Sequence, residues 1–422
     1  MSKRSTRRGR QSVPSEQSQA PSKKPRVEDS NSGSGSGSGE TSTVVTPIQA
    51  PSPAITRDSQ HYYEDGSVVL LVGNVLFKVH ASLLKARSKV FKDMLTPPPS
   101  QDDIKPEGLT DEHPIKITDV TASEFRNLLV IFYALPSDMV SLGIQGATYP
   151  VRAWPAFVSL SDVARLTKRF CMTDDEKWAA SRLKFLIRSS ITNIATGARG
   201  NLKDGVLAVF MLALQYAIAI PDISLAYGIR NLIQYSCTQP TNLSAQALVG
   251  FHRFLRPRQQ DRSLFGFSFI MLLNLGHAVW GQEWFTREER IILFSAQSYL
   301  TPLPGLLGEG LTTPVLSKPA YTKAGYLDLF AYANCVENCQ RRLSLAWKAA
   351  FNQSYYTEVT SSELMKPTGQ IGRLPRLRLE FAGTACANSA CKIDCGAKAL
   401  ASLDADIDQL FVRLAGYYRG VD

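Results

Sequence analysis

The chain has 422 residues, enough for two or three domains, and 44% of them are hydrophobic, which excludes a wholly disordered protein. The net charge is +10, but residues 1–26 alone carry +7, so the remainder is close to neutral and argues against nucleic acid as a partner. Seven cysteines are too few for a secreted disulfide scaffold, which favours a reducing compartment, the nucleus or the cytoplasm.

Residues 1–60 are predicted to be a disordered tail, because they contain few large apolar side chains and include the flexible repeat SGSGSGSG. Two basic clusters on this accessible segment are typical of a nuclear-import signal, and the alternative is a solvated basic tail that nothing reads. The residues assigned to the signal are Lys3, Arg4, Lys23, Lys24 and Arg26.

Folded structure is predicted to begin near His61. Residues 67–73 and 75–80 are rich in β-formers and are separated by a Gly-Asn hairpin signal. A helix with an apolar face between Leu83 and Leu95 follows, then a short strand around residues 115–117. The next helix is expected to start with a capping box at Thr121 and Glu124.

A loop is expected from Ala134 to Pro155, and the rest of the chain has a mostly helical pattern that ends in a final helix over residues 400–418. Two apolar runs, residues 205–220 and 264–280, fall short of the roughly 20 residues that a membrane span needs. We therefore interpret them as buried core helices and expect no membrane contact.

The run DGSVVLLVGNVLFKVHASLLKARSKVFKDML, with the later HPIKITDVTASEFRNLLVIFYA, resembles the BTB/POZ domain. The whole chain is similar to the large group of BTB proteins of mushroom-forming fungi. The resemblance implies an α+β fold, a short β-sheet capped by helices, followed by an all-α region. The residues that carry the domain and its core are Asp65, Phe77, Val79, His80, Leu83, Leu84, Ser88, Phe91, Phe125 and Leu128.

These patterns divide the chain into four parts. They are a tail (1–60), a BTB/POZ domain (61–190), a helical region (191–345) and a C-terminal cysteine-containing region (346–422). In long BTB domains an extra N-terminal helix and strand exchange between subunits. The polar segment before Asp65 looks too short for that pair, which argues against a strand-exchanged dimer.

His80 lies where the strand pattern changes to a helical one. A polar group at such a position usually satisfies local backbone groups, so we interpret His80 as structural. The alternative, a catalytic base, lacks a neighbouring nucleophile or acid in the sequence.

Five cysteines in the C-terminal part have spacings compatible with a zinc site, although no CxxC pair occurs and no histidine is near. The alternative is ordinary buried thiols, in which case the protein has no cofactor. The candidate ligands are Cys335, Cys339, Cys386, Cys391 and Cys395.

Arg373, Arg376 and Arg378 alternate with apolar residues, as on an exposed strand edge. We interpret them as a solvated face, with nucleic-acid contact as the alternative.

The sequence contains no phosphate-binding loop, nucleophile elbow or paired carboxylates, so we expect no enzyme activity. The resemblance implies a protein–protein interaction module that acts as an adaptor or self-association scaffold. Its expected partners are a second copy or a cullin scaffold for ubiquitin transfer. The alternative is a nuclear, transcription-associated protein with a C-terminal Cys/Arg region that binds nucleic acid or zinc.

Overall fold

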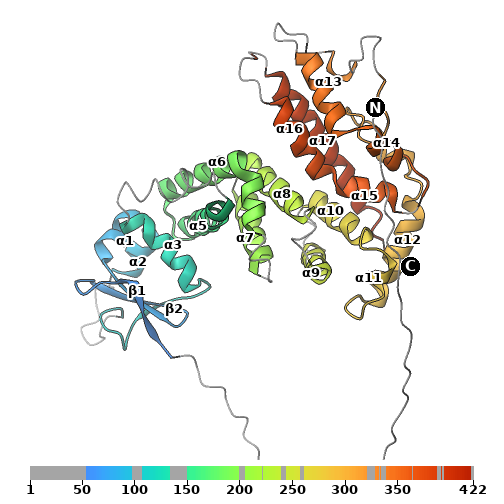
Figure 1. The fold of residues 1–422 in the computed structure, drawn as a ribbon. Coiled ribbons are helices and arrows are strands. Elements are labelled where there is room, and N and C mark those ends of the chain that lie inside the picture. Colours follow the sequence, from blue (N-terminus) through green and yellow to red (C-terminus); the bar gives the residue numbers. More distant parts are fainter. Residues whose placement is uncertain are drawn as a thin grey trace, which may run out of the picture. The chain divides into compact units, whose positions relative to one another are not determined.

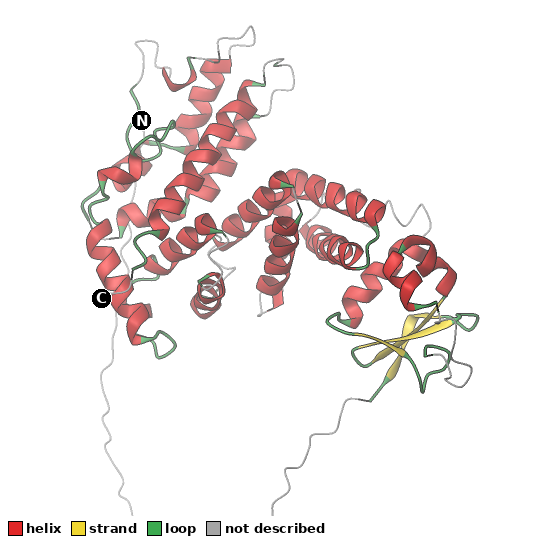
Figure 2. Ribbon diagram, turned by 180° about the vertical axis from the view of Figure 1, so that it is seen from behind, coloured by secondary structure: helices red, strands yellow, loops and turns green. Residues whose placement is uncertain are grey.

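The computed structural model confirms a small sheet near the N-terminus followed by helices (Figures 1 and 2). All four strands assigned in the described part of the chain lie before residue 118. The predicted import residues in the tail fall outside this part. The described residues are 54–96, 107–133, 150–198, 205–220, 222–238, 244–256, 261–320, 328–331, 333, 339–363, 365–386, 391 and 394–419.

The sheet has the strand order β1-β3-β2-β4, and the strands are β1 (Thr56–Tyr62), β2 (Val68–Val72), β3 (Val75–Val79) and β4 (Ile115–Ile117). Strands β2 and β3 form the predicted antiparallel hairpin, and its turn uses Gly73 at a φ of +61°, where a residue without Cβ is favoured. The two outer strands are both parallel to their neighbours, β1 to β3 and β4 to β2.

Three helices lie on one side of this sheet, namely α1 (Ala81–Arg87), α2 (Lys89–Met94) and α3 (Ala122–Tyr133) (Figure 1). The single helix predicted over residues 83–95 is in fact two, because Ser88 adopts an extended conformation between them. Its hydroxyl accepts from the Phe91 amide at 3.0 Å and donates to the Phe170 carbonyl at 2.6 Å. Ser88 therefore caps α2 and also fastens the helix pair to the next part of the chain.

The predicted core is largely correct. Phe77 of β3 and Phe125 of α3 meet edge to face, 5.1 Å between ring centroids. Three of the ten predicted residues are not buried: Asp65 is exposed, His80 is half-buried, and Leu83 is 39% exposed whereas the adjacent Leu84 is fully buried. The buried members of the predicted set are Phe77, Val79, Leu84, Ser88, Phe91, Phe125 and Leu128.

The helix after the sheet domain begins earlier than expected. Residues 150–155 were predicted to be loop, but α5 runs from Pro150 to Arg169 and tolerates Pro155 within its second turn. It packs along α6 (Thr173–Ala198), which begins within four residues of its end. The next helices are α7 (Gly205–Ala219), α8 (Ile223–Cys237) and α9 (Ala245–Leu255).

The two apolar runs form buried helices, as predicted, although the second is broken at Gly276 into α10 (Arg262–Leu273) and α11 (His277–Trp280). Nowhere in the described ranges is a helix both long and apolar enough to span a bilayer. Helix α10 packs on α17 (Cys395–Ala415) so closely that a Cβ on Gly266 would lie 1.8 Å from the Phe411 carbonyl oxygen.

The C-terminal part is helical as well. The predicted final helix is α17, which starts five residues before the predicted range. The helical pattern predicted for the rest of the chain includes the segment that begins at residue 328. The described residues of that segment form a short 3₁₀ turn, η3 (Asp328–Phe330), followed by α13. The remaining elements are α12 (Arg287–Leu300), η2 (Gly305–Gly308), α13 (Cys339–Ala350), α14 (Gln353–Val359), α15 (Lys366–Gly372) and α16 (Leu374–Ala385).

Candidate functional site

His80 lies between β3 and α1, where the sequence placed it, and its contacts are structural. Its backbone N–H donates to the Tyr133 hydroxyl at 2.9 Å, its Nδ1 lies 3.0 Å from the same hydroxyl, and its Nε2 lies 3.2 Å from Asp65 Oδ2. All these contacts are satisfied when Tyr133 donates to Nδ1 and Nε2–H donates to the carboxylate. His80 thus joins the hairpin, α1 and the last residue of α3.

Electrostatics around His80 agree with this role. Burial raises the pKa of Tyr133, so its hydroxyl keeps the proton that it donates. The hydrogen bond from His80 lowers the pKa of Asp65, whose side chain is otherwise exposed. Within the described residues, no Ser, Thr or Cys side chain forms a hydrogen bond with His80, and its ring nitrogens are used in holding the fold.

Strand β1 corrects the expectation that residues 1–60 are a disordered tail throughout, because it begins at Thr56 and places part of the polar segment before Asp65 in the sheet. It is held by Asp58, a buried carboxylate that accepts from the amides of Gln60 and His61 and from Arg126 of α3 at 2.6 Å. Burial alone would raise the pKa of Asp58, but these hydrogen bonds outweigh it and the pKa lies below its ordinary value. Strand β1 pairs with β3 of its own chain.

The outer face of α1 and α2 exposes apolar side chains. Leu83 of α1 and Met94 of α2 are each 39% exposed, and each sits beside a fully buried residue, Leu84 and Phe91 respectively within the same helix. The other exposed positions of the two helices are mostly polar or charged, so each helix offers one partly exposed large apolar side chain to solvent.

Among the described carboxylates, Asp162 of α5, which follows the sheet domain, has a strongly raised pKa. Asp162 of α5 accepts from Asn127 Nδ2 at 2.8 Å and lies 3.7 Å from Arg165, which also pairs with Glu124. Burial, with Glu124 nearby, raises the pKa of Asp162 to about 6, although Asn127 and Arg165 act in the other direction. The group joins α3 to α5.

Comparison with known families decides the identity of this part of the chain. Residues 60–142 match the family model of the BTB/POZ domain. The chain contains a BTB/POZ domain. No curated protein and no solved structure matched the sequence. A BTB/POZ domain is a protein–protein interaction module, which makes its surface, rather than a reactive side chain, the first place to look for function.

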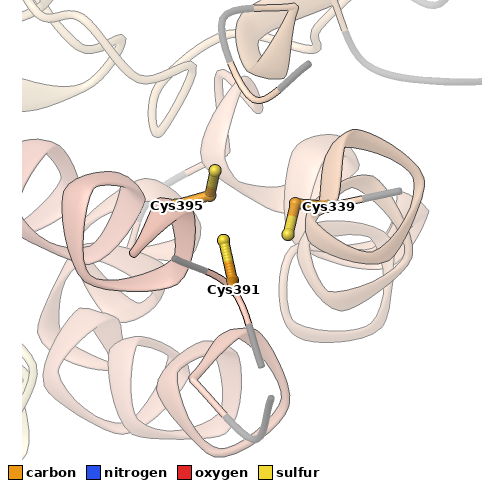
Figure 3. Close-up of side chains that lie close together, drawn as sticks. All are labelled: Cys339, Cys391 and Cys395. Atoms are coloured by element: carbon orange, nitrogen blue, oxygen red, sulfur yellow. The ribbon is translucent and has the colours of Figure 1, made fainter. Parts of the chain in front are cut away.

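The predicted cysteine site is partly assembled. Cys339, Cys391 and Cys395 lie close together in Figure 3, and their sulfur atoms all lie within 4.8 Å of one another. Cys386 is exposed and is not part of this group. Cys335 falls outside the described residues.

The interpretation of Arg373–Arg378 as an exposed strand edge is wrong. Arg376 and Arg378 belong to helix α16, and Arg373 is its N-cap residue. Arg378 forms a bidentate, largely buried ion pair with Asp404 of α17, with N···O distances of 2.7 and 2.8 Å. Arg376 pairs with Glu380 of its own helix at 3.1 Å. Because Arg376 and Arg378 already form ion pairs with carboxylates of the same chain, they do not support nucleic-acid binding by this region.

An open cavity of about 800 Å³ lies against the loop from Pro302 to Ala320. Its lining is formed mainly by Pro, Leu, Thr and Ser side chains, and Glu309 is the one titratable residue among the described residues that line it. General acid–base or nucleophilic chemistry needs at least a second positioned group, so the cavity does not resemble an active site.

Sequence reasoning missed several residues that hold the domain together. Tyr133, Asp58 and Arg126 were not singled out, and each acts through a partner at least 50 residues away. No local pattern marks such a contact. The one usable signal was the aromatic end of the α3 pattern, where Tyr133 follows Phe132 at the point where the helix ends.

Proposed function

We propose that this chain is a non-enzymatic adaptor whose BTB/POZ domain associates with a second copy of itself, and that the helices after it present a second docking surface. The observation that supports the proposal is the surface of α1 and α2, where Leu83 and Met94 are exposed on a domain of an interaction family. Apolar burial between facing helices would provide the free energy of association.

A stable dimer needs a larger contact than Leu83 and Met94 alone provide. A stable interface buries about 1,200–2,000 Å² in total, so two side chains act as anchors within a larger contact rather than as the whole of it. In a twofold dimer the same patch serves both subunits, so one substitution removes two anchors. This makes Leu83 a sensitive position for a test.

Light scattering on the purified full-length chain tests self-association. We expect a dimer for the wild type and a shift toward monomer for Leu83→Glu, because a buried unpaired carboxylate opposes association. At a protein concentration low enough to dissociate the wild-type dimer, Leu83→Glu should leave the unfolding midpoint nearly unchanged, since the side chain is already partly exposed in the monomer. A monomeric wild type at all concentrations would refute self-association.

Leu84→Ala is the matched variant. It removes a fully buried side chain in the same helix, so it should cost about 2–5 kcal/mol of stability. If Leu84→Ala and Leu83→Glu change stability equally, then the assignment of one leucine to the core and the other to the surface is wrong.

We further propose that the domain recruits a cullin scaffold and that the protein acts in the nucleus. Support for the first comes from the BTB/POZ match alone, and support for the second comes from the two basic clusters of the N-terminal segment. Pull-down with a purified cullin checks the first, and absence of the cullin from the bound fraction would refute it. Loss of nuclear signal in a variant with Lys23, Lys24 and Arg26 changed to Ala checks the second.

A further inference from the structure

Three cysteines from two distant parts of the sequence meet at one end of a helix group. Cys339 is the first residue of α13, Cys391 lies in the connection after α16, and Cys395 is the first residue of α17. More than 50 residues separate Cys339 from the other two, yet the three side chains lie close together (Figure 3), with their sulfur atoms within 4.8 Å of one another.

The geometry points to a metal site, and we propose that Cys339, Cys391 and Cys395 bind one Zn²⁺ ion. Zinc bonds thiolate sulfur at about 2.3 Å, so two sulfurs of a tetrahedral site are about 3.8 Å apart. Sulfur atoms that all lie within 4.8 Å of one another need shifts of about 1 Å or less to reach that arrangement. Soft thiolate ligands select zinc over Mg²⁺ or Ca²⁺.

The local electrostatics favour the thiolate form that a metal requires. Cys395 begins α17, a helix of 21 residues, and the N-terminal end of a helix carries a partial positive charge that stabilises a thiolate. Arg342, one turn into α13, places a guanidinium nitrogen 3.6 Å from the Cys339 sulfur. Three thiolates around a divalent ion carry a net charge of −1, which this arginine would offset.

The backbone is also built to bring these elements together. Gly396 follows Cys395, and a Cβ at Gly396 would lie 2.4 Å from the carbonyl oxygen of Ala385 at the end of α16. The glycine thus allows the start of α17 to approach the end of α16. Cys339 and Cys395 are buried, whereas Cys391 is half-buried and leaves a route from solvent to the centre.

A metal ion here would be a structural fastener. It would tie the start of α13 to the start of α17, two helices that both pack against α16. Structural zinc sites stabilise the folded chain directly, because the unfolded chain does not hold a formed site. The trio supplies three ligands. The number of sulfur atoms bound to zinc, which X-ray absorption measures, shows whether the fourth ligand is also a thiolate.

The experiment uses the full-length chain purified with a reducing agent and zinc. Mass spectrometry of metals should give about one zinc per chain, and X-ray absorption should give a zinc shell with three or four sulfur atoms. Replacement of zinc by Co²⁺ should produce thiolate-to-cobalt charge-transfer absorption. Cys391→Ser, at the half-buried position, should lower zinc affinity at least about tenfold, as even the loss of an outer partner of a metal ligand can.

Matched controls are Cys171→Ser, at an exposed position, and Cys237→Ser, in buried α8, which should both retain wild-type zinc. The wild-type cobalt spectrum keeps the proposal testable even if Cys391→Ser does not fold. A wild type that binds no zinc after reconstitution, zinc retention in Cys391→Ser equal to that in Cys171→Ser, or a zinc shell without sulfur would each overturn it. A disulfide within the trio in the zinc-supplemented protein would do so too.

Discussion

The BTB/POZ domain and the C-terminal helices both join segments far apart in the sequence, but with different chemistry. In the domain, strand pairing and an apolar core do most of the joining, and polar groups such as His80 and Asp58 complete it at the edges. In the C-terminal part, helices are joined by close backbone packing at Gly266 and by the Arg378–Asp404 pair, and three cysteines from different segments lie close together.

This difference suggests different roles for the two regions, association with other molecules for the domain and stability of the fold for the C-terminal helices. Leu83 and Met94 of the domain are partly exposed, whereas in the C-terminal part Arg378 is paired with Asp404 and the three cysteines lie close to one another. The comparison predicts that substitutions in the C-terminal helices change stability, and that surface substitutions in the domain change association. The following variants test how far this division holds.

The largest effect is expected for Gly266→Ala. A Cβ there would overlap the Phe411 carbonyl of α17, which is backbone and cannot move aside without separating two helices. We expect a loss of more than about 4 kcal/mol in the free energy of unfolding, measured by denaturant titration. Gly383→Ala is the control, because its Cβ would meet no atom within 4 Å, and it should be neutral or stabilising by up to about 1 kcal/mol. Equal stability of the two variants would contradict the close packing of α10 on α17.

Next in size is Arg378→Met, which would leave Asp404 as a largely buried, unpaired carboxylate. Removal of one partner of such a pair costs about 3–5 kcal/mol, whereas a double replacement by apolar residues is often neutral. We therefore expect Arg378→Met with Asp404→Leu to recover most of the loss in a double-mutant cycle. Arg376→Ala breaks an exposed pair in the same helix and should cost less than about 1 kcal/mol. A loss for Arg378→Met no larger than that for Arg376→Ala would show that the buried pair has no structural role.

The sequence predicted what is local. The hairpin could be predicted because Gly73-Asn74 and the alternation around it are next to each other in the chain. Strand β1 could not, since its side chains are mostly polar and its partner β3 is about 20 residues away. The break at Ser88 was not predicted, because the apolar spacing of Phe91 and Met94 continues that of α1. The structure explains the break by helix capping, since the Ser88 side chain accepts from the Phe91 amide at the start of α2.

The candidate site follows the same rule. Spacing made the pairs Cys335/Cys339, Cys386/Cys391 and Cys391/Cys395 equally compatible with a site. Which cysteines meet depends on how α13 packs, and no local pattern reports that. At Leu374–Arg378 the alternation of Arg with Leu gave a strand period. The buried positions Leu374, Leu377 and Phe381 instead follow a helical one, and burial of that face decides the outcome.

A smaller effect is expected for Asp162→Asn, at the junction of α3 and α5. Burial raises the pKa of Asp162 to about 6 in the folded protein, above its value in the unfolded chain. Ionisation of Asp162 therefore lowers the free energy of unfolding. At pH 7 the amide should therefore raise the free energy of unfolding by about 2 kcal/mol, and this advantage should shrink as the pH falls from 6 toward 4. Denaturant titrations of both proteins at pH 7 and 4.5 measure it. An advantage that is equal at both pH values would show that the charge of Asp162 is not its cause.

His252 in α9 should give the opposite pH dependence and the smallest effect. It is buried against Phe265, and burial lowers its pKa to about 3, although Glu289 acts against the shift while Arg253 and Arg256 add to it. Ser268 donates to the Phe265 carbonyl, so its hydroxyl accepts from His252 Nδ1, which leaves Nε2 as the unprotonated nitrogen.

The unfolded histidine takes up a proton below about pH 6.5 and the folded one does not, so stability from neutral His252 is present above that pH and is lost as the pH falls. Between pH 7 and 5.5 we expect the wild type to lose about 1 kcal/mol more than His252→Phe, which keeps the ring packing without a titrating group. Denaturant midpoints at the two pH values measure the difference. Parallel losses in the two proteins would mean that His252 is protonated in the folded state, and that α9 is less closed to water than the arrangement of Phe265 and Tyr418 around it indicates.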